Sequence, residues 1–215
     1  MVIDIAKKFI DYIYDELVKA PAIESYVNQA LIPRDLAYRY ANMYQDDVIA
    51  DLSRRGIKPL DSSALEELVY ALYDGGVAYI GKGTAGALYV DSLMPSTMAR
   101  NVVAMLHTHP VPIPIPTPED LASAANIGYR TECVASRDSK HVDIVCVTPR
   151  RKWSEAVEAC SKLGRSVLSV ERFLVIGNSE GIAFVPMPSP REKDLLIEDM
   201  ITAMSPVAKV EVVRV

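Results

Sequence analysis

Residues 102–120 decide the fold expected of this chain, and they are VVAMLHTHPVPIPIPTPED. The apolar run over 102–106 is typical of a strand buried in the middle of a sheet. Alternating prolines follow up to residue 118. Because proline fixes φ and restricts the residue before it, residues 111–117 are expected to form a stiff extended segment. Residues 117–120 then provide a capping threonine, a proline at the first helical position and two acids, which predict a helix.

The flanking sequence predicts an α/β (α+β) fold with a mixed sheet between helices. Apolar periodicity and turn residues place strands at 77–80, 87–93, 102–106, 132–136, 141–147 and 207–214, helices at 118–127, 152–163 and 190–203, and a hairpin over 171–186 that turns at 178–181.

The first sixty residues predict a helical layer. Apolar residues recur at helical spacing over 5–18, and a second helix is expected over 33–55, with Gly56 as its C-terminal cap. That helix should bury Leu36, Tyr40, Met43 and Tyr44. We therefore expect two parts, an N-terminal helical extension at 1–60 and a main domain at 61–215.

The segment 61–76 allows two interpretations. Ser63 and Glu66 have the spacing of a capping box, and apolar residues follow at helical spacing as far as Leu72, which favours a helix ending at Gly75 and Gly76. The alternative is a strand over 66–73 with the two glycines in a hairpin turn.

Composition excludes several classes of protein. The chain has 215 residues, of which 50% are apolar, and a net charge of −5, so it should fold and should not have nucleic acid as its main partner. No apolar run reaches the roughly 18 residues of a membrane span, and the N-terminus lacks a signal-peptide core. The three cysteines do not form a CxxC motif, so neither a zinc ribbon nor a thioredoxin-type motif is present. We therefore expect buried, reduced thiols in a cytoplasmic protein.

Two histidines directly after the apolar run predict a metal site. His107 and His109 stand at i and i+2, so they project to the same side of an extended backbone, and Asp120 follows eleven residues later. Two imidazoles, a carboxylate and a water make an open zinc site of the kind that supports hydrolysis. The alternatives are two solvent-facing histidines and a helix start that involves no metal. The remaining histidine, His141, is expected to be exposed near a hairpin turn.

The sequence from 107 to 120 resembles the JAMM (MPN-plus) family of zinc metalloproteases. The family motif is HxHP, six residues, Ser, two residues, Asp, and here the serine is replaced by Thr117. The likeness covers residues 63–147. It implies that His107, His109 and Asp120 bind Zn²⁺ and that the Thr117 hydroxyl stabilises the oxyanion.

The resemblance also implies a general base near residue 70. The family has a glutamate at the start of an early strand in a pattern like ExxGxxxG, which corresponds here to Asp74, one methylene shorter. If 66–73 is a strand, Glu67 or Glu66 takes this role. A protein that binds metal without a competent base is the third alternative.

The expected function is zinc-dependent hydrolysis of peptide or isopeptide bonds. By resemblance the substrates are ubiquitin-like protein conjugates or small amino-acid conjugates. The alternative is a non-catalytic MPN-type scaffold, with protein partners bound through the N-terminal helices.

Overall fold

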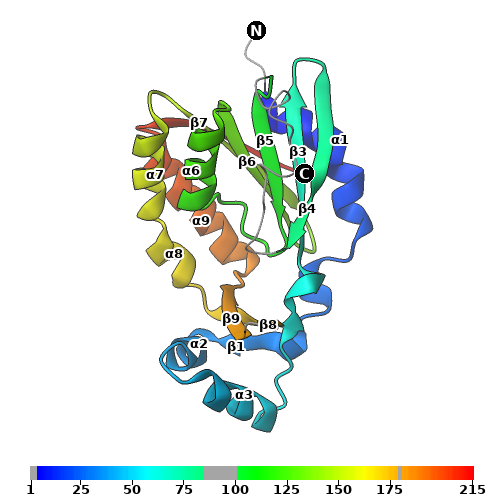
Figure 1. Cartoon of the computed structure of the whole chain (residues 1–215), viewed down its shortest axis with the longest axis vertical. Helices are drawn as coiled ribbons and strands as arrows, with labels where there is room; N and C mark the ends of the chain where they lie inside the picture. The colour runs from blue at the N-terminus through cyan, green and yellow to red at the C-terminus, as the bar shows by residue number, and fades with distance from the viewer. Residues whose placement is uncertain (1–3, 85–100, 179–180) are drawn as a thin grey trace.

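The computed structural model describes residues 4–84, 101–178 and 181–215. It is a mixed α+β structure with two sheets, a larger one with helices on both faces and a smaller one below it (Figure 1). The strand expected at 87–93 lies outside the described residues.

The larger sheet has six strands in the order β10-β7-β6-β5-β3-β4. Only the neighbours β5 and β6 are parallel, and the other pairs are antiparallel. The strands are β3 (Glu66–Tyr73), β4 (Gly76–Thr84), β5 (Ala104–His109), β6 (Thr131–Arg137), β7 (Val142–Pro149) and β10 (Ala208–Arg214).

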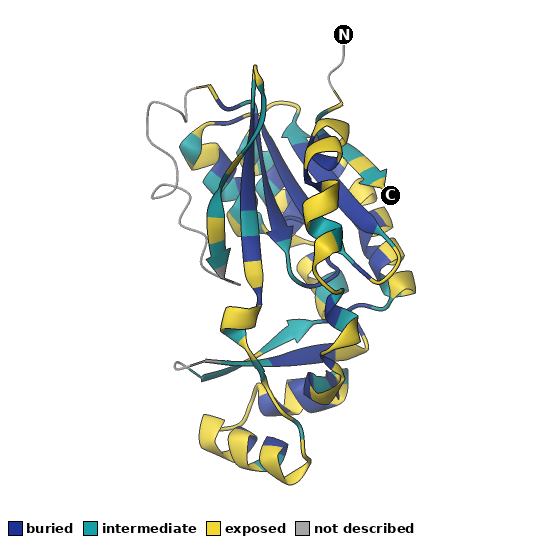
Figure 2. Ribbon diagram, turned by 90° about the vertical axis from the view of Figure 1, so that its right-hand side faces the viewer, coloured by how far each residue is buried: buried dark blue, intermediate teal, exposed yellow. Residues whose placement is uncertain are grey.

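Helices cover the two faces of this sheet. The helix α1 (Ile5–Lys19) packs its buried residues against one face, where Leu106 of β5 and Ile144 of β7 lie. The opposite face contacts α6 (Pro118–Ile127), α7 (Trp153–Ser161) and α9 (Pro190–Met204). Figure 2 shows that the strands between these layers are largely buried. A buried ion pair of Lys193 with Asp138 and Asp143 ties α9 to the β6–β7 hairpin.

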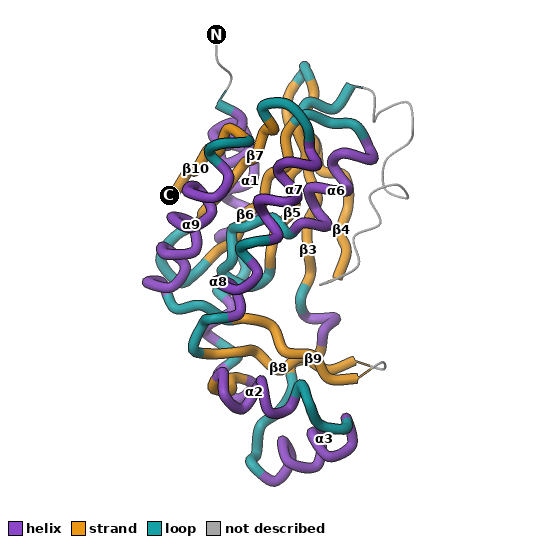
Figure 3. The backbone as a smooth tube through the Cα atoms, turned by 90° about the vertical axis from the view of Figure 1, so that its left-hand side faces the viewer, coloured by secondary structure: helices purple, strands orange, loops and turns teal. Residues whose placement is uncertain are grey.

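The smaller sheet joins distant parts of the chain. Its central strand β8 (Arg172–Asn178) pairs with β1 (Leu31–Pro33), β2 (Leu60–Asp61) and β9 (Gly181–Pro186). The helices α2 (Arg34–Tyr40) and α3 (Gln45–Arg54) lie beside it, and α8 (Gly164–Leu168) leads into it (Figure 3). Short 3-10 helices occupy Ile23–Ser25, Asn28–Ala30 and Ser62–Ala64. The strand β2 crosses the boundary that the sequence places between the N-terminal extension, 1–60, and the main domain, 61–215.

The expected helix after Ser63 is wrong, and the alternative of a strand is confirmed. The strand β3 pairs with β4 on one side and β5 on the other. The hairpin turn is Asp74 and Gly75, one residue earlier than expected, and Gly76 is the first residue of β4. The side chain of Asp61, rather than a capping box, accepts from the Ser63 N–H. A short apolar run is compatible with the periodicity of a helix and with that of a strand. Only its pairing with a distant strand decides between the two structures.

The single helix expected over 33–55 is also wrong. The chain breaks at 41–44 into α2 and α3, and Tyr44 is 85% exposed instead of buried, with Met43 exposed as well. The Tyr40 hydroxyl donates to Asp51 at 2.7 Å, which links the two short helices. The sequence has no glycine or proline at 41–44 to mark this break. Gly56 does follow the helix with φ of +69°, as its capping role requires.

The other predicted elements are confirmed within a few residues, and α6 has the expected bounds, Pro118–Ile127. The structure adds α8, β1 and β2, which are too short to produce a periodic signal. Among the described residues no helix is long and apolar enough to cross a membrane.

The expectation of three reduced cysteines is wrong. Cys133 and Cys146 are directly opposite each other in β6 and β7 and form a disulfide beneath α1, while Cys160 is free and buried. A spacing of 13 residues does not reveal a disulfide of this kind, because it depends on the register of the two strands.

Candidate metal centre

The strand β5 presents both histidines on one face of the larger sheet. His107 pairs with Val69 of β3 and with Val134 of β6, and His109 is the last residue of the strand. Because residues at i and i+2 share a face, both imidazoles project to the side that α6 covers. Asp120, in the first turn of α6, approaches them from above that face.

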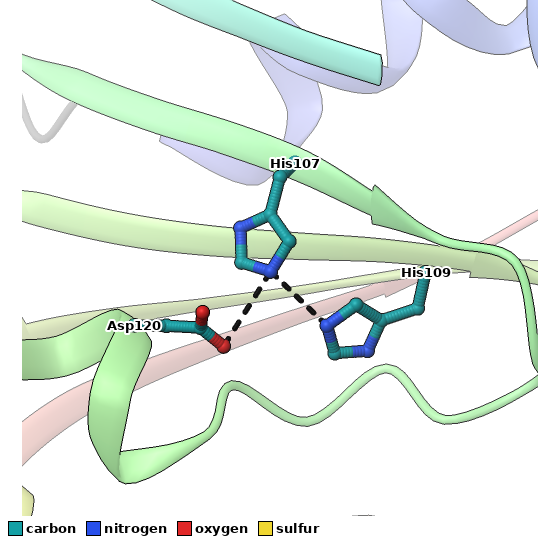
Figure 4. A group of neighbouring side chains, drawn as sticks. All are labelled: His107, His109 and Asp120. Atoms are coloured by element: carbon teal, nitrogen blue, oxygen red, sulfur yellow. Dashed lines mark hydrogen bonds and ion pairs between the residues drawn. The ribbon is translucent and has the colours of Figure 1, made fainter. Parts of the chain in front are cut away.

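The three side chains converge on one point (Figure 4). The Nε2 atoms of His107 and His109 are 3.0 Å apart, and the Nε2 of His107 is 3.5 Å from Oδ2 of Asp120. Ligands at about 2.0–2.1 Å from a tetrahedral zinc ion are separated by about 3.3–3.4 Å. These two distances are close to that separation, and all three ligand atoms lie within 4.8 Å of one another, so the group could hold a single metal ion. Three protein ligands would leave the fourth position of a tetrahedral site open.

Outer contacts hold both rings so that their Nε2 atoms face this point. The Nδ1–H of His107 donates to Oε1 of Glu132 at 2.8 Å, and the Tyr129 hydroxyl donates to the other oxygen of Glu132 at 2.5 Å. The Nδ1 of His109 lies 2.7 Å from the carbonyl oxygen of Ile113, which can only accept. The proton of neutral His109 is thus on Nδ1, and the Nε2 lone pair is free for a metal.

Sequence reasoning missed Glu132, Tyr129 and the Ile113 carbonyl. Glu132 and Tyr129 lie beyond the motif and show no metal-ligand spacing. A weak signal was present, because a glutamate within a strand of otherwise small and apolar residues needs a buried partner.

The proline segment supports the site, as its expected stiffness predicts. The side chains of Val111, Ile113 and Ile115 are buried in the core with exposed fractions of 4–7%. This packing fixes the segment and holds the Ile113 carbonyl against His109.

The electrostatics of the cluster favour a cation. Burial would lower the pKa of His107, but the nearby carboxylates of Asp120 and Glu132 raise it well above its ordinary value. Burial and the neighbouring His107 lower the pKa of His109 to about 4. Burial opposes ionisation of Asp120, yet the two histidines hold its pKa well below the ordinary value. The carboxylates of Asp120 and Glu132 therefore favour positive charge at this point of the structure.

Glu67 is a buried carboxyl on the same face. It lies two residues before Val69, the strand partner of His107, so its side chain projects to the side of the sheet that carries His107. Burial, chiefly, raises the pKa of Glu67 to about 7; the charge of His107 lowers it and that of Asp120 raises it. A carboxyl with this pKa can both accept and return a proton near neutral pH.

The two other candidate bases do not reach the site. Asp74, the expected base, is exposed in the β3–β4 turn, five residues beyond Val69 and hence about 16 Å along the strand. This expectation is wrong because it assumed that the segment before Asp74 is helical. Glu66 projects to the opposite face from Glu67 and pairs with Lys82 at 2.5 Å.

The expected oxyanion donor Thr117 caps α6. Its hydroxyl accepts from the Asp120 N–H at 3.2 Å, and Oδ2 of Asp120 accepts from the Thr117 N–H at 2.7 Å. The helix cap and the metal ligand are therefore the same carboxylate, so the two interpretations of residues 117–120 are compatible. His141 is partly exposed beside Asp138 and outside the cluster.

No protein-family model, curated protein or solved structure matches this chain. The described residues nevertheless contain one group that could hold a metal ion, His107, His109 and Asp120.

Proposed function

We propose that this protein is a zinc-dependent hydrolase of peptide or isopeptide bonds. The observation that carries the proposal is the convergence of His107, His109 and Asp120 beside Glu67, a buried carboxyl with a pKa of about 7. Two imidazoles and a carboxylate with an open fourth position are the ligand set of a catalytic zinc site.

His107, His109 and Asp120 would hold the zinc ion, which would polarise the scissile carbonyl as a Lewis acid and lower the pKa of a water molecule. Glu67 is the proposed general base. It accepts a proton as the water oxygen bonds to the carbonyl carbon, and it returns that proton to the nitrogen as the C–N bond breaks. Thr117 is the proposed donor to the oxyanion, since its hydroxyl hydrogen is free while its oxygen accepts from the Asp120 N–H.

The resemblance of residues 107–120 to the JAMM motif supports this reaction class. It suggests ubiquitin-like protein conjugates or small amino-acid conjugates as substrates, and protein partners that contact the N-terminal helices. Since residues 66–73 form a strand, we propose that Glu67, and not Asp74, corresponds to the family glutamate.

The test compares the zinc-loaded protein with its Glu67→Gln variant on a peptide library and on isopeptide-linked ubiquitin-like conjugates. We expect equal zinc content and a fall in turnover of about a hundredfold or more, the usual contribution of a general base. The matched control is Asp74→Asn, which changes an exposed carboxyl in the β3–β4 turn and should leave turnover unchanged.

Equal turnover in the wild type and Glu67→Gln would contradict the proposal. Failure of the zinc-loaded wild type to cleave either substrate class would also contradict it, and would favour the non-catalytic scaffold.

A further inference from the structure

The strand β10 forms one edge of the larger sheet. It pairs with β7 over its whole length, Ala208–Arg214, and in the described part of the chain no strand pairs with its other side. Figure 3 shows β10 and α9 together at one margin of the molecule. A long, regular edge with free N–H and C=O groups is a template for pairing with another strand.

The pairing with β7 decides which backbone groups of β10 point outward. Val215 and Val142 exchange two backbone hydrogen bonds of 2.8 and 3.0 Å, and at the other end of the strand the Arg150 N–H donates to the Val207 carbonyl. In an antiparallel ladder such hydrogen-bonded pairs alternate with pairs that are not hydrogen-bonded. The odd-numbered residues of β10 therefore bond to β7. The N–H and C=O groups that point away from the sheet belong to Ala208, Val210, Val212 and Arg214.

Exposed apolar side chains flank this edge on the face that α9 covers. Arg214 donates to Asp194 at 2.7 Å, so one side of α9 lies along β10. Ile201 is seven residues after Asp194, hence on the same side of the helix, and it is 39% exposed. Val212 projects to the same face of β10 as Arg214 and is 38% exposed. The free backbone groups therefore lie beside a strip of apolar surface.

The opposite face of β10 carries a self-complementary pair of charges. Lys209 and Glu211 form an ion pair there, and Glu211 also accepts from the first N–H groups of α1. If two copies of β10 pair antiparallel with Val210 at the centre, Lys209 of each copy is opposite Glu211 of the other. A pairing centred on Glu211 sets two glutamates opposite each other, which is unfavourable, and one centred on Val212 sets both charges opposite valines.

We propose that this protein forms a homodimer in which β10 pairs antiparallel with β10 of a second copy, about a two-fold axis at Val210. Val210 then bonds to Val210 of the second copy, and Ala208 bonds to Val212, in each case through groups that point outward in the single chain. The two larger sheets become one continuous sheet. This surface is separated from β5 by β6 and β7, so the inference does not depend on the proposed function.

Sedimentation equilibrium of the full chain and of its Val210→Pro variant tests the dimer. The Val210 N–H points to solvent in the single chain, so proline removes a hydrogen bond only from the dimer. We expect a dimer with a micromolar or lower Kd in the wild type, and a Kd at least about tenfold higher in the variant. A wild type that stays monomeric up to about 100 μM, or an equal Kd in the folded variant, would overturn the inference.

A change of charge tests the predicted contact between the two copies. Lys209→Glu places an acid opposite Glu211 of the second copy and should raise the Kd at least about tenfold. The matched control is Lys140→Glu, which makes the same change of charge in the exposed β6–β7 turn and should leave the Kd unchanged. An equal Kd in the two variants would overturn the proposed contact.

Cysteine cross-linking tests the register. A residue on the two-fold axis is opposite itself, with the two Cα atoms about 5.5 Å apart, a separation that a disulfide spans. Val210→Cys should therefore give a covalent dimer on mild oxidation. Val212→Cys, which is opposite Ala208 of the second copy, should not, and neither should the wild type, whose free Cys160 is buried. Cross-linking of Val212→Cys without that of Val210→Cys would overturn the axis at Val210.

Discussion

Glu67 and Glu66 are neighbours in the sequence, yet they lie in opposite environments. Alternation along β3 buries Glu67 on the face of His107 and leaves Glu66 exposed, where it pairs with Lys82. Nothing in the composition distinguishes the two carboxylates. The environment of each carboxylate depends on the register of β3. The sequence therefore limited the general base to Asp74, Glu67 or Glu66 but could not decide among them.

The raised pKa of Glu67 predicts a specific pH dependence in metal-free protein. The folded pKa is about 7 against 4.5 for an unperturbed side chain, so the folded state binds more protons between these values. Its stability therefore falls as the pH rises from about 4.5 to 7. Glu67→Gln removes this loss, and the variant should gain up to about 3 kcal/mol relative to the wild type above pH 7. Urea unfolding with a chelator at pH 5 to 8 measures the difference, and a constant difference would contradict the assignment.

Glu132 should increase metal affinity through His107. Its carboxylate accepts from Nδ1 of His107 at 2.8 Å and is itself held by the Tyr129 hydroxyl. We expect Glu132→Gln to weaken zinc binding about 10–100-fold, the usual effect of losing an outer partner of a metal-ligating histidine, and Tyr129→Phe to weaken it less. Competition with a chromophoric chelator measures both. Glu158→Gln, on the exposed side of α7, is the control, and unchanged affinity in Glu132→Gln would refute the role.

At the scale of elements, the link between β5 and α6 was the most predictable part of the chain. Prolines at 110–118 restrict the backbone locally, and the cap of α6 is encoded within four residues. Local sequence was insufficient to predict two segments. At 66–73 the pairing of strands decided between helix and strand, and at 41–44 the helix breaks although no glycine or proline is present. Glu132 and Tyr129 were missed for the same reason, because their role depends on which strand lies beside β5.

The cap of α6 gives a prediction about Thr117. Thr117→Ala removes the acceptor for the Asp120 N–H and should cost about 1 kcal/mol of stability. If the hydroxyl also donates to the oxyanion, turnover should fall a hundredfold or more, while Thr117→Ser should retain both properties. Thermal unfolding and steady-state kinetics of the three proteins measure the two effects. Near-normal turnover in Thr117→Ala would leave Thr117 as a cap alone.

At the scale of the whole molecule, contacts between distant segments hold the site in place. The helix α1 covers the back of the sheet behind the two histidines, and β1 and β2 of the N-terminal region pair with β8 of the C-terminal region. The sequence predicted a helical N-terminal layer but not these strand pairings, because two- and three-residue strands have no period to detect.

The disulfide between β6 and β7 predicts the thiol content of the purified protein. With Cys133 and Cys146 joined, denatured and unreduced protein should react with one equivalent of thiol reagent, at Cys160. Reduction should lower stability by about 3 kcal/mol, the value expected for a loop of this length. Three reactive thiols before reduction would show that the disulfide is absent.

The central claim is that His107, His109 and Asp120 hold one zinc ion with an open position, and X-ray absorption at the zinc edge tests it most directly. One equivalent of zinc should show only nitrogen and oxygen ligands at about 2.0–2.1 Å, with the scattering of two imidazoles. This signature should disappear in His109→Ala. Failure to retain zinc, or a sulfur ligand at about 2.3 Å, would contradict the account.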